Sequence, residues 1–197
     1  MAIKGEQTRA AILDRAIRLS STVGLESLSL AVLAREVGLS KSGLFAHFRS
    51  KEDLQLQLIE RARARFVERV VAPALKRPRG EPRFRTMFEK WLEWDSGPDL
   101  PGGCVFMTFA HELDDRPGPP RDALVATLRE WVETLKTAAR LAIAEGHFRA
   151  NVDVDELVFE AYGIVLAYNH FHRTLGIERA ERRARRAFDA LIDRARR

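Results

Sequence analysis

The 197 residues of the chain are 46% hydrophobic and 31% charged, and they carry a formal net charge of +5. That apolar share is typical of a globular protein, and no apolar run approaches the roughly 18 residues that a membrane-spanning helix needs. Cys104 is the only cysteine, which excludes an intrachain disulfide, and the N-terminus has no signal-peptide core. We therefore expect a cytoplasmic protein that does not contact a membrane.

The positive charge is concentrated at one end of the chain. The first 51 residues contain eight basic and four acidic side chains, an excess of four that accounts for most of the net charge. Because the rest of the chain is nearly balanced, this distribution favours a polyanionic partner for the N-terminal segment.

The N-terminal segment predicts three helices joined by tight turns. A first helix spans 8–23 and stops at Gly24, and Ser29 can cap a second helix. The apolar stripe of that second helix has the offsets 0, 3, 4 and 7 of one helix face, and it comprises Leu30, Leu33, Ala34 and Val37. Gly38 allows a left-handed turn, and Ser40 can then cap a third helix. The pattern predicts a helix-turn-helix, whose second helix enters the DNA major groove.

The third helix has one apolar side and one side suited to DNA. At about 100° per residue, Leu44, His47 and Phe48 share the inner side. The opposite side presents cations, a hydroxyl, a methyl and a ring, but no carboxylate, as contacts to phosphates and base edges require. A solvated helix with an exposed phenylalanine is the alternative. The residues expected at the DNA are Ser29, Ser40, Lys41, Ser42, Gly43, Phe45, Ala46, His47, Arg49 and Lys51.

The fourth helix begins with a capping box, in which Ser50 is the N-cap and Asp53 follows three residues later. Lys51 in the first turn opposes the helix dipole, unless a phosphate occupies that N-terminus. The alternative is a flexible lysine whose charge is offset by Glu52 and Asp53.

The remaining chain predicts helices separated by Pro- and Gly-rich loops. We expect the fourth helix over 51–75, and later helices over 83–95, 104–113, 121–145, 155–174 and 178–195. With no strand alternation, the fold class is all-α, with about nine helices. The arginine run 182–186 is interpreted as a solvated face rather than a second DNA site.

The segment from about Thr8 to Leu54, and in particular SLAVLAREVGLSKSGLFAHFRSKED, resembles the DNA-binding domain of the tetracycline-repressor (TetR) family. This resemblance implies a DNA-binding domain at 1–50 and a helical effector-binding and dimerisation domain at 51–197, linked by the fourth helix. It also implies a homodimeric repressor, released from a palindromic operator in double-stranded DNA by a small molecule. Two positions depart from the family pattern: Phe45 stands where tyrosine is common, and Gly43 where a serine, threonine or alanine is usual. Gly43 either allows close approach of the backbone to DNA or is simply tolerated.

An effector would bind between helices of the larger domain, in a mostly apolar cavity. We expect an apolar or aromatic compound, contacted by Phe88, Trp91, Trp94, Phe106, Phe109, Trp131 and Tyr162. The last two helices are expected to form the dimer contact, although they could instead close the core of one protomer. The dimer residues expected are Phe171, Ala184, Phe188 and Leu191.

The sequence contains no arrangement typical of an enzyme or a metal site. His170 and His172 are two residues apart, so they point in nearly opposite directions on a helix. Cys104 and His111 could share a helix face, but a buried thiol and an edge histidine explain both residues. We therefore expect no catalytic residue, metal or cofactor. The alternatives to a repressor are an activator or an unregulated DNA-binding protein, and, less favoured, a helical ligand-binding protein or enzyme.

Overall fold

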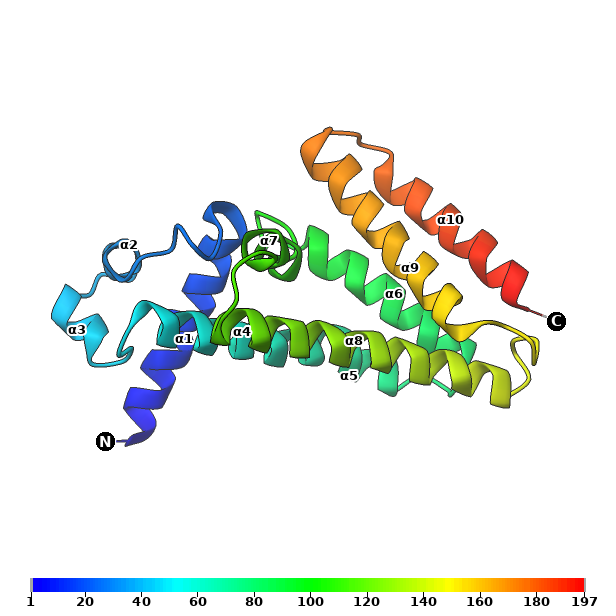
Figure 1. Cartoon of the computed structure of the whole chain (residues 1–197), viewed down its shortest axis with the longest axis horizontal. Helices are drawn as coiled ribbons and strands as arrows, with labels where there is room; N and C mark the ends of the chain where they lie inside the picture. Colours follow the sequence, from blue (N-terminus) through cyan, green and yellow to red (C-terminus); the bar gives the residue numbers. More distant parts are fainter. Residues whose placement is uncertain (1, 197) are drawn as a thin grey trace. The chain divides into compact units, whose positions relative to one another are not determined.

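The computed structural model describes residues 2–196, without the side chains of residues 2–6 and of Lys41. The elements in chain order are α1 (Ala2–Val23), α2 (Leu30–Glu36), α3 (Lys41–Phe45), α4 (Lys51–Phe66), η1 (Val67–Val71), α5 (Ala72–Leu75), α6 (Glu81–Ser96), α7 (Val105–Leu113), α8 (Pro119–Ala144), α9 (Val154–Asn169), η2 (His170–Thr174) and α10 (Ala180–Ala195) (Figure 1). Because η1 joins α4 to α5 and η2 extends α9, the described chain forms nine helical runs and no strand. The predicted all-α class is confirmed. No helix within residues 2–196 combines the length and apolar character needed to cross a membrane.

The sequence predicts one α-helix over 51–75, but residues 67–71 of this run, η1, are π-helical. In η1, a π-helical segment, backbone N–H groups donate to carbonyls five residues earlier instead of four. The N–H of Ala72, for example, donates to the carbonyl of Val67. Pro73 explains this change, because its nitrogen has no hydrogen to donate and its ring would clash with the carbonyl four residues earlier. The run therefore accommodates Pro73 without ending.

The chain divides into two compact units, each made of two segments. The first unit contains the chain up to Arg65 together with Ser96–Leu128, and the second contains Phe66–Asp95 together with the chain from Arg129 onward. These units are interleaved in sequence, whereas the predicted domains, 1–50 and 51–197, are continuous. The predicted division concerns function, and it stays a prediction.

The core of the first unit joins α1 and the helix-turn-helix to the start of α4. Its fully buried side chains include Ala16, Ile17, Leu25, Leu28, Leu33, Leu44, Phe48, Leu54 and Leu58. Arg61 of α4 forms a two-pronged ion pair with Asp14 of α1, with both N–O distances 2.8 Å. Cys104, which is buried, occupies the N-cap position of α7 in the same unit.

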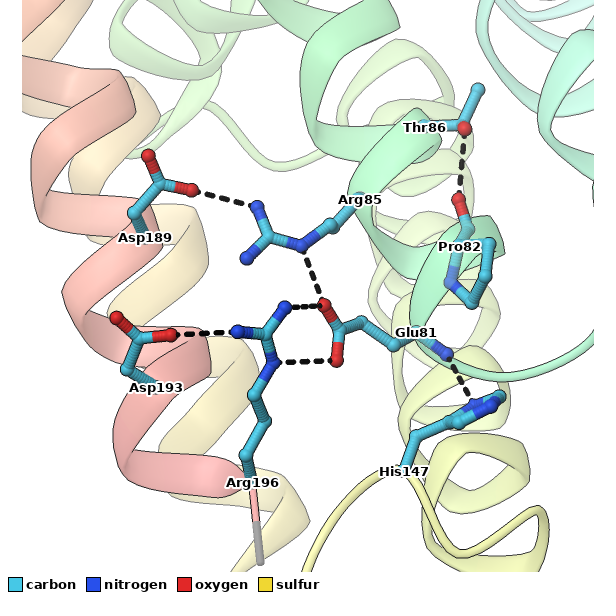
Figure 2. Close-up of polar contacts among 8 residues, drawn as sticks. All are labelled: Glu81, Pro82, Arg85, Thr86, His147, Asp189, Asp193 and Arg196. Carbon is cyan, nitrogen blue, oxygen red and sulfur yellow. Dashed lines mark hydrogen bonds and ion pairs between the residues drawn. The ribbon is translucent and has the colours of Figure 1, made fainter.

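Aromatic stacking and ion pairs hold the second unit together. Phe88 of α6 stacks on Phe188 of α10, with ring centroids 3.7 Å apart and planes 5° apart. Beside this stack, Glu81 accepts hydrogen bonds from both Arg85 and Arg196, as Figure 2 shows. The hydrogen bonds from Arg196, the largest cause, and from Arg85 lower the pKa of the Glu81 carboxyl. Together with the ion pair from Arg85 to Asp189, they tie α6 to α10. Within the same unit α9 and α10 run antiparallel, side by side (Figure 1).

Candidate nucleic-acid interface

The turn between α2 and α3 has the backbone geometry that the sequence predicts. Ser29 caps α2 by accepting a hydrogen bond from the Val32 N–H at 3.2 Å. Gly38 has a φ of +68°, and the N–H of Leu39 donates to the carbonyl of Ala34 at 2.9 Å, which closes the end of α2. Ser40 then caps α3 by accepting from the Gly43 N–H at 3.0 Å. Local hydrogen bonds thus define the turn between the two helices.

The α3 segment separates its faces as predicted. Leu44 and Phe48 are fully buried, whereas Ser42, Ala46 and Arg49 are exposed and the Phe45 side chain is 45% exposed. The helix is shorter than expected, because the N–H of His47 donates to the carbonyl of Leu44 and tightens the chain into a turn after Phe45. The side chain of Lys41 lies outside the described part of the structure.

Gly43 has a local reason to lack a side chain. A Cβ at this position would lie 3.2 Å from the Ser40 hydroxyl oxygen, the atom that caps α3.

His47 is half-buried beside Phe48, with ring centroids 6.4 Å apart, so its imidazole lies at the edge of the exposed face.

The capping box of α4 is present, with one difference from the predicted pattern. Asp53 donates its N–H to the Ser50 hydroxyl at 3.0 Å, but its carboxylate accepts from the N–H of Arg49, at 2.8 Å, rather than from Ser50. This bond from the Arg49 N–H is the largest cause of a lowered pKa of the Asp53 carboxyl, and a bond from the Gln57 side-chain amide also lowers it. The first turn of α4 is therefore fixed to the end of the α3 segment.

Lys51 is hydrogen-bonded within the protein. Its ammonium group donates to the carbonyl oxygen of Glu26 at 2.8 Å and to the Glu26 Oε2 at 3.0 Å. Neither Glu52 nor Asp53 is its partner in these bonds. The Lys51 bond is the largest cause of a lowered pKa of the Glu26 carboxyl, and Gln55 and Arg116 also contribute. Lys51 is thus positioned at the N-terminus of α4 by a residue of the α1–α2 loop.

The segment between α6 and α8 holds the end of α1 and the loop that leads into the helix-turn-helix, which the sequence did not reveal. Glu112 of α7 accepts hydrogen bonds from the backbone N–H groups of Leu25 and Glu26, at 2.6 and 3.2 Å. Gly102 donates its N–H to the Ser21 hydroxyl at 2.9 Å, and a Cβ on Gly102 would lie only 1.5 Å from the carbonyl oxygen of Ser21. No periodicity marks contacts between residues so far apart in sequence.

A family model described as "Tetracyclin repressor-like, C-terminal domain" matches residues 80–188, which is more than half of the chain, and "Bacterial regulatory proteins, tetR family" matches residues 12–58. The chain belongs to the TetR family of transcriptional regulators. The regulatory role of this family, rather than any catalytic one, confirms the prediction that the protein is not an enzyme.

Relatives of this TetR-family chain include AcrR, an HTH-type transcriptional regulator from Shigella flexneri. AcrR is 37% identical over 57 residues, which are 29% of this chain and 26% of AcrR, so the match spans about a quarter of that relative. A TetR transcriptional regulator from Chloroflexus aurantiacus J-10-FL has a TM-score of 0.84 and 26% identity, with 96% of this chain and 94% of that chain covered. A transcriptional regulator from Saccharomonospora viridis, in complex with choline, has a TM-score of 0.81 and 22% identity, with 98% and 99% covered.

The residues predicted to bind an effector in this TetR-family chain are divided between its two units. Phe106 and Phe109 are buried in α7 of the first unit, whereas the other five belong to the second unit. There Trp91 packs edge-to-face against Trp131 and Tyr162, with ring centroids 5.3 and 4.8 Å apart. Phe88 is covered by Phe188. Phe88, Trp91 and Trp131 are therefore part of the packed interior of that unit.

A cavity of about 290 Å³ opens in the second unit between α5, α6 and α8, and none of the seven predicted residues lines it. Leu75, Met87, Ala138 and Leu141 supply its apolar wall, and Arg83, Glu130, Glu133, Thr134 and Thr137 its polar wall. The Arg83 Nη2 donates to the carbonyl oxygens of Leu75 and Arg77, each at 3.2 Å. The buried Nε of the same guanidinium has no hydrogen-bond partner among the described residues.

The predicted dimer residues divide between the interior and the surface of the second unit. Phe188, Leu191 and Ala184 are buried within the protomer, whereas Phe171 is 41% exposed. Ala184 and Phe171 both line an apolar groove of about 200 Å³ between α9 and α10. The most exposed large apolar side chain of these helices is Phe159, at 79%.

Proposed function

We propose that this TetR-family protein is a repressor that binds a palindromic operator as a homodimer and leaves it when a small molecule binds. The exposed face of the α3 segment is the observation that carries this proposal. It offers a hydroxyl from Ser42, a ring from Phe45, a methyl from Ala46 and a cation from Arg49, whereas Leu44 and Phe48 are turned inward. These are the groups that bind phosphates and base edges in the major groove.

Lys51 and the capped N-terminus of α4 supply a second contact to the DNA backbone. The free N–H groups at a helix N-terminus favour an anion, and the lysine adds a positive charge at the same place. An ammonium group has three donors, and the two bonds to Glu26 leave one available for a phosphate.

The dimer contact in this proposal uses the outward side of α9 and α10. Phe159, Leu166 and Phe171 are all more than 40% exposed, and an apolar groove lies between the two helices. Exposed apolar side chains concentrated in one helix pair are typical of a protein contact. A two-fold pair of helix-turn-helix domains then selects an operator with two half-sites.

The effector in this proposal occupies the cavity between α5, α6 and α8. Its apolar wall suits the hydrocarbon or aromatic body of a ligand, and the unpartnered Nε of Arg83 suits a hydrogen-bond acceptor such as a carbonyl or carboxylate oxygen. The choline bound in the Saccharomonospora viridis regulator supports small-molecule binding by this fold.

A gel-shift titration with DNA from upstream of the protein's own gene tests operator binding. Arg49→Ala and Lys51→Ala should each weaken binding and reduce the salt slope by about 0.9, if each side chain neutralises one phosphate. Arg182→Ala, on exposed α10, is the matched control and should leave the slope unchanged. If both variants keep the wild-type affinity and slope, the proposed interface is wrong.

Analytical ultracentrifugation tests the dimer contact. Phe159→Glu should give a monomer and remove tight operator binding, because it places a charge in an apolar contact. Val67→Glu changes an exposed apolar residue of η1 in the same way and should leave a dimer. A wild-type protein that sediments as a monomer at micromolar concentration would contradict the proposal.

Operator release separates a regulated repressor from an unregulated DNA-binding protein. A compound that binds the cavity should release operator DNA over the concentration range in which it binds, because ligand and DNA then favour different states of the protein. Thr137→Trp, which puts a bulky ring at a residue that lines the cavity, should prevent release and leave operator binding intact. If ligands bind the wild type and none changes operator affinity, the unregulated alternative is correct.

A further inference from the structure

One carboxylate oxygen beside the proposed DNA contact is shared by two cations. The Oε2 of Glu26 lies 3.0 Å from the Lys51 ammonium and 3.1 Å from the Arg116 guanidinium. The other oxygen, Oε1, accepts a hydrogen bond from the Gln55 amide at 2.8 Å. Glu26 is therefore the centre of a cluster that joins the α1–α2 loop, α4 and the loop after α7.

This cluster matters because Glu26 and a DNA phosphate would attract the same ammonium group. A carboxylate without a second cation attracts Lys51 strongly and repels an approaching phosphate. When a guanidinium shares the carboxylate, its charge is offset, so both effects become weaker. The position of Arg116 therefore influences how readily Lys51 can bind a phosphate.

We propose that Arg116 is a positioning residue for DNA binding, which acts on Lys51 through Glu26. The proposal rests on the repressor function proposed above and names a residue outside the helix-turn-helix that tunes it. With Arg116 in place, Lys51 is available to the phosphate. When Arg116 is withdrawn, Glu26 retains Lys51 and the operator is bound less tightly.

The chain around Arg116 connects this cluster to α7 and α8. Glu112 of α7 fixes the backbone N–H of Glu26, and the N–H of Arg116 donates to the carbonyl of Leu113, the last residue of α7. Arg116 lies three residues before the start of α8 at Pro119. A shift of the first turn of α8 relative to α7 would therefore move Arg116 relative to Glu26.

The size of the effect follows from the exposure of the side chains. Arg116, Lys51 and Glu26 are 60%, 44% and 30% exposed, so water and salt screen their interactions. Exposed ion pairs of this kind change an equilibrium by about two- to five-fold at low salt. We expect changes of operator affinity in that range, and smaller changes at high salt.

A double-mutant cycle with operator DNA tests the proposal. Arg116→Gln should weaken operator binding about two- to five-fold, and Glu26→Gln should not weaken it. In the Glu26→Gln background, Arg116→Gln should have no effect beyond that of Arg121→Gln, a control that removes one positive charge from the same segment. Equal losses from Arg116→Gln in both backgrounds would mean that Arg116 contacts the DNA directly and would overturn the proposal, as would no loss in either.

A measurement without DNA keeps the proposal separate from the repressor function. The rate at which an acylating reagent modifies Lys51, followed by peptide mass spectrometry, reports how firmly Glu26 holds the amine. Arg116→Gln should slow this modification, and Glu26→Gln should accelerate it in either Arg116 background. Failure of the wild type to bind operator would contradict only the repressor function, whereas an unchanged Lys51 modification rate in Arg116→Gln would overturn the role of Arg116.

Discussion

Replacing Gly102 with alanine should destabilise the first unit, because no space exists for a single methyl group there. The added Cβ would lie 1.5 Å from the carbonyl oxygen of Ser21, 1.9 Å from its carbonyl carbon and 2.5 Å from the nitrogen of Thr22. All three are backbone atoms in the last turn of α1, so no side-chain rotation can relieve the contact. The 97–104 loop must move away from α1.

The cost of that movement can be estimated from two contributions. Inserting a methyl group into a packed site costs about 1–3 kcal/mol. Withdrawal of the loop also breaks the 2.9 Å hydrogen bond from Gly102 to Ser21, which contributes about 0.5–1.5 kcal/mol. The sum is about 1.5–4.5 kcal/mol, and for a protein of this size it should lower the melting temperature by roughly 3–18 °C.

Thermal unfolding followed by far-ultraviolet circular dichroism measures this effect. Ser21→Ala is the matched control, because it removes the hydroxyl that accepts from Gly102 without introducing a clash. It should cost only about 0.5–1.5 kcal/mol. If Gly102→Ala melts within 1 °C of the wild type, or no lower than Ser21→Ala, the close approach of the loop to α1 is wrong.

Three further variants test the packing and the charges. Asp53→Ala should lower the free energy of unfolding by about 1 kcal/mol, because its carboxylate no longer accepts from the Arg49 N–H and the Gln57 amide. Because the pKa of Asp53 is lowered in the folded state, this difference should hold at neutral pH and diminish as pH falls through that pKa, in urea titrations at several pH values. Glu81→Gln should lower the melting temperature at neutral pH, and the difference should likewise fade in acid; a pH-independent difference would exclude the ion pairs of Figure 2 as its cause. Phe88→Ala should cost about 3–5 kcal/mol in urea unfolding, since the ring is buried against Phe188; a loss below about 1 kcal/mol would contradict this packing.

The helix-turn-helix could be predicted in detail because every signal that defines it is local. Gly38 adopts the left-handed conformation that the end of α2 requires, and Leu44 and Phe48 are buried four residues apart. Caps, turns and a helix period involve residues within about one or two turns of each other, so a single sequence contains all the information needed.

Long-range contacts of the same unit could not be predicted. Glu112 binds the backbone N–H of Leu25, 87 residues earlier, and Gly102 binds Ser21, 81 residues earlier. A glutamate on an amphipathic helix and a glycine in a loop have no property that identifies such partners. The same holds for Lys51, whose ion pair with Glu26 depends on how the α1–α2 loop folds back on α4.

The apolar stripe of α10 shows a different limit of sequence reasoning. Periodicity identifies which side of a helix will be covered, but not which element covers it. Phe188 was expected at a dimer contact, and the structure packs it against Phe84 and Phe88 of α6 instead. The alternative that the final helices close the core of one protomer therefore describes Phe188, while the exposed Phe159 remains available to a partner.

The rate at which Cys104 is chemically modified can report how often the first unit opens. The thiol is buried at the start of α7, and it is the only cysteine in the chain. A reagent that modifies thiols can reach it only when this region opens, so the rate of modification measures the frequency of that opening in the unaltered protein. The rate of local opening beside the helix-turn-helix can thus be measured without introducing a label.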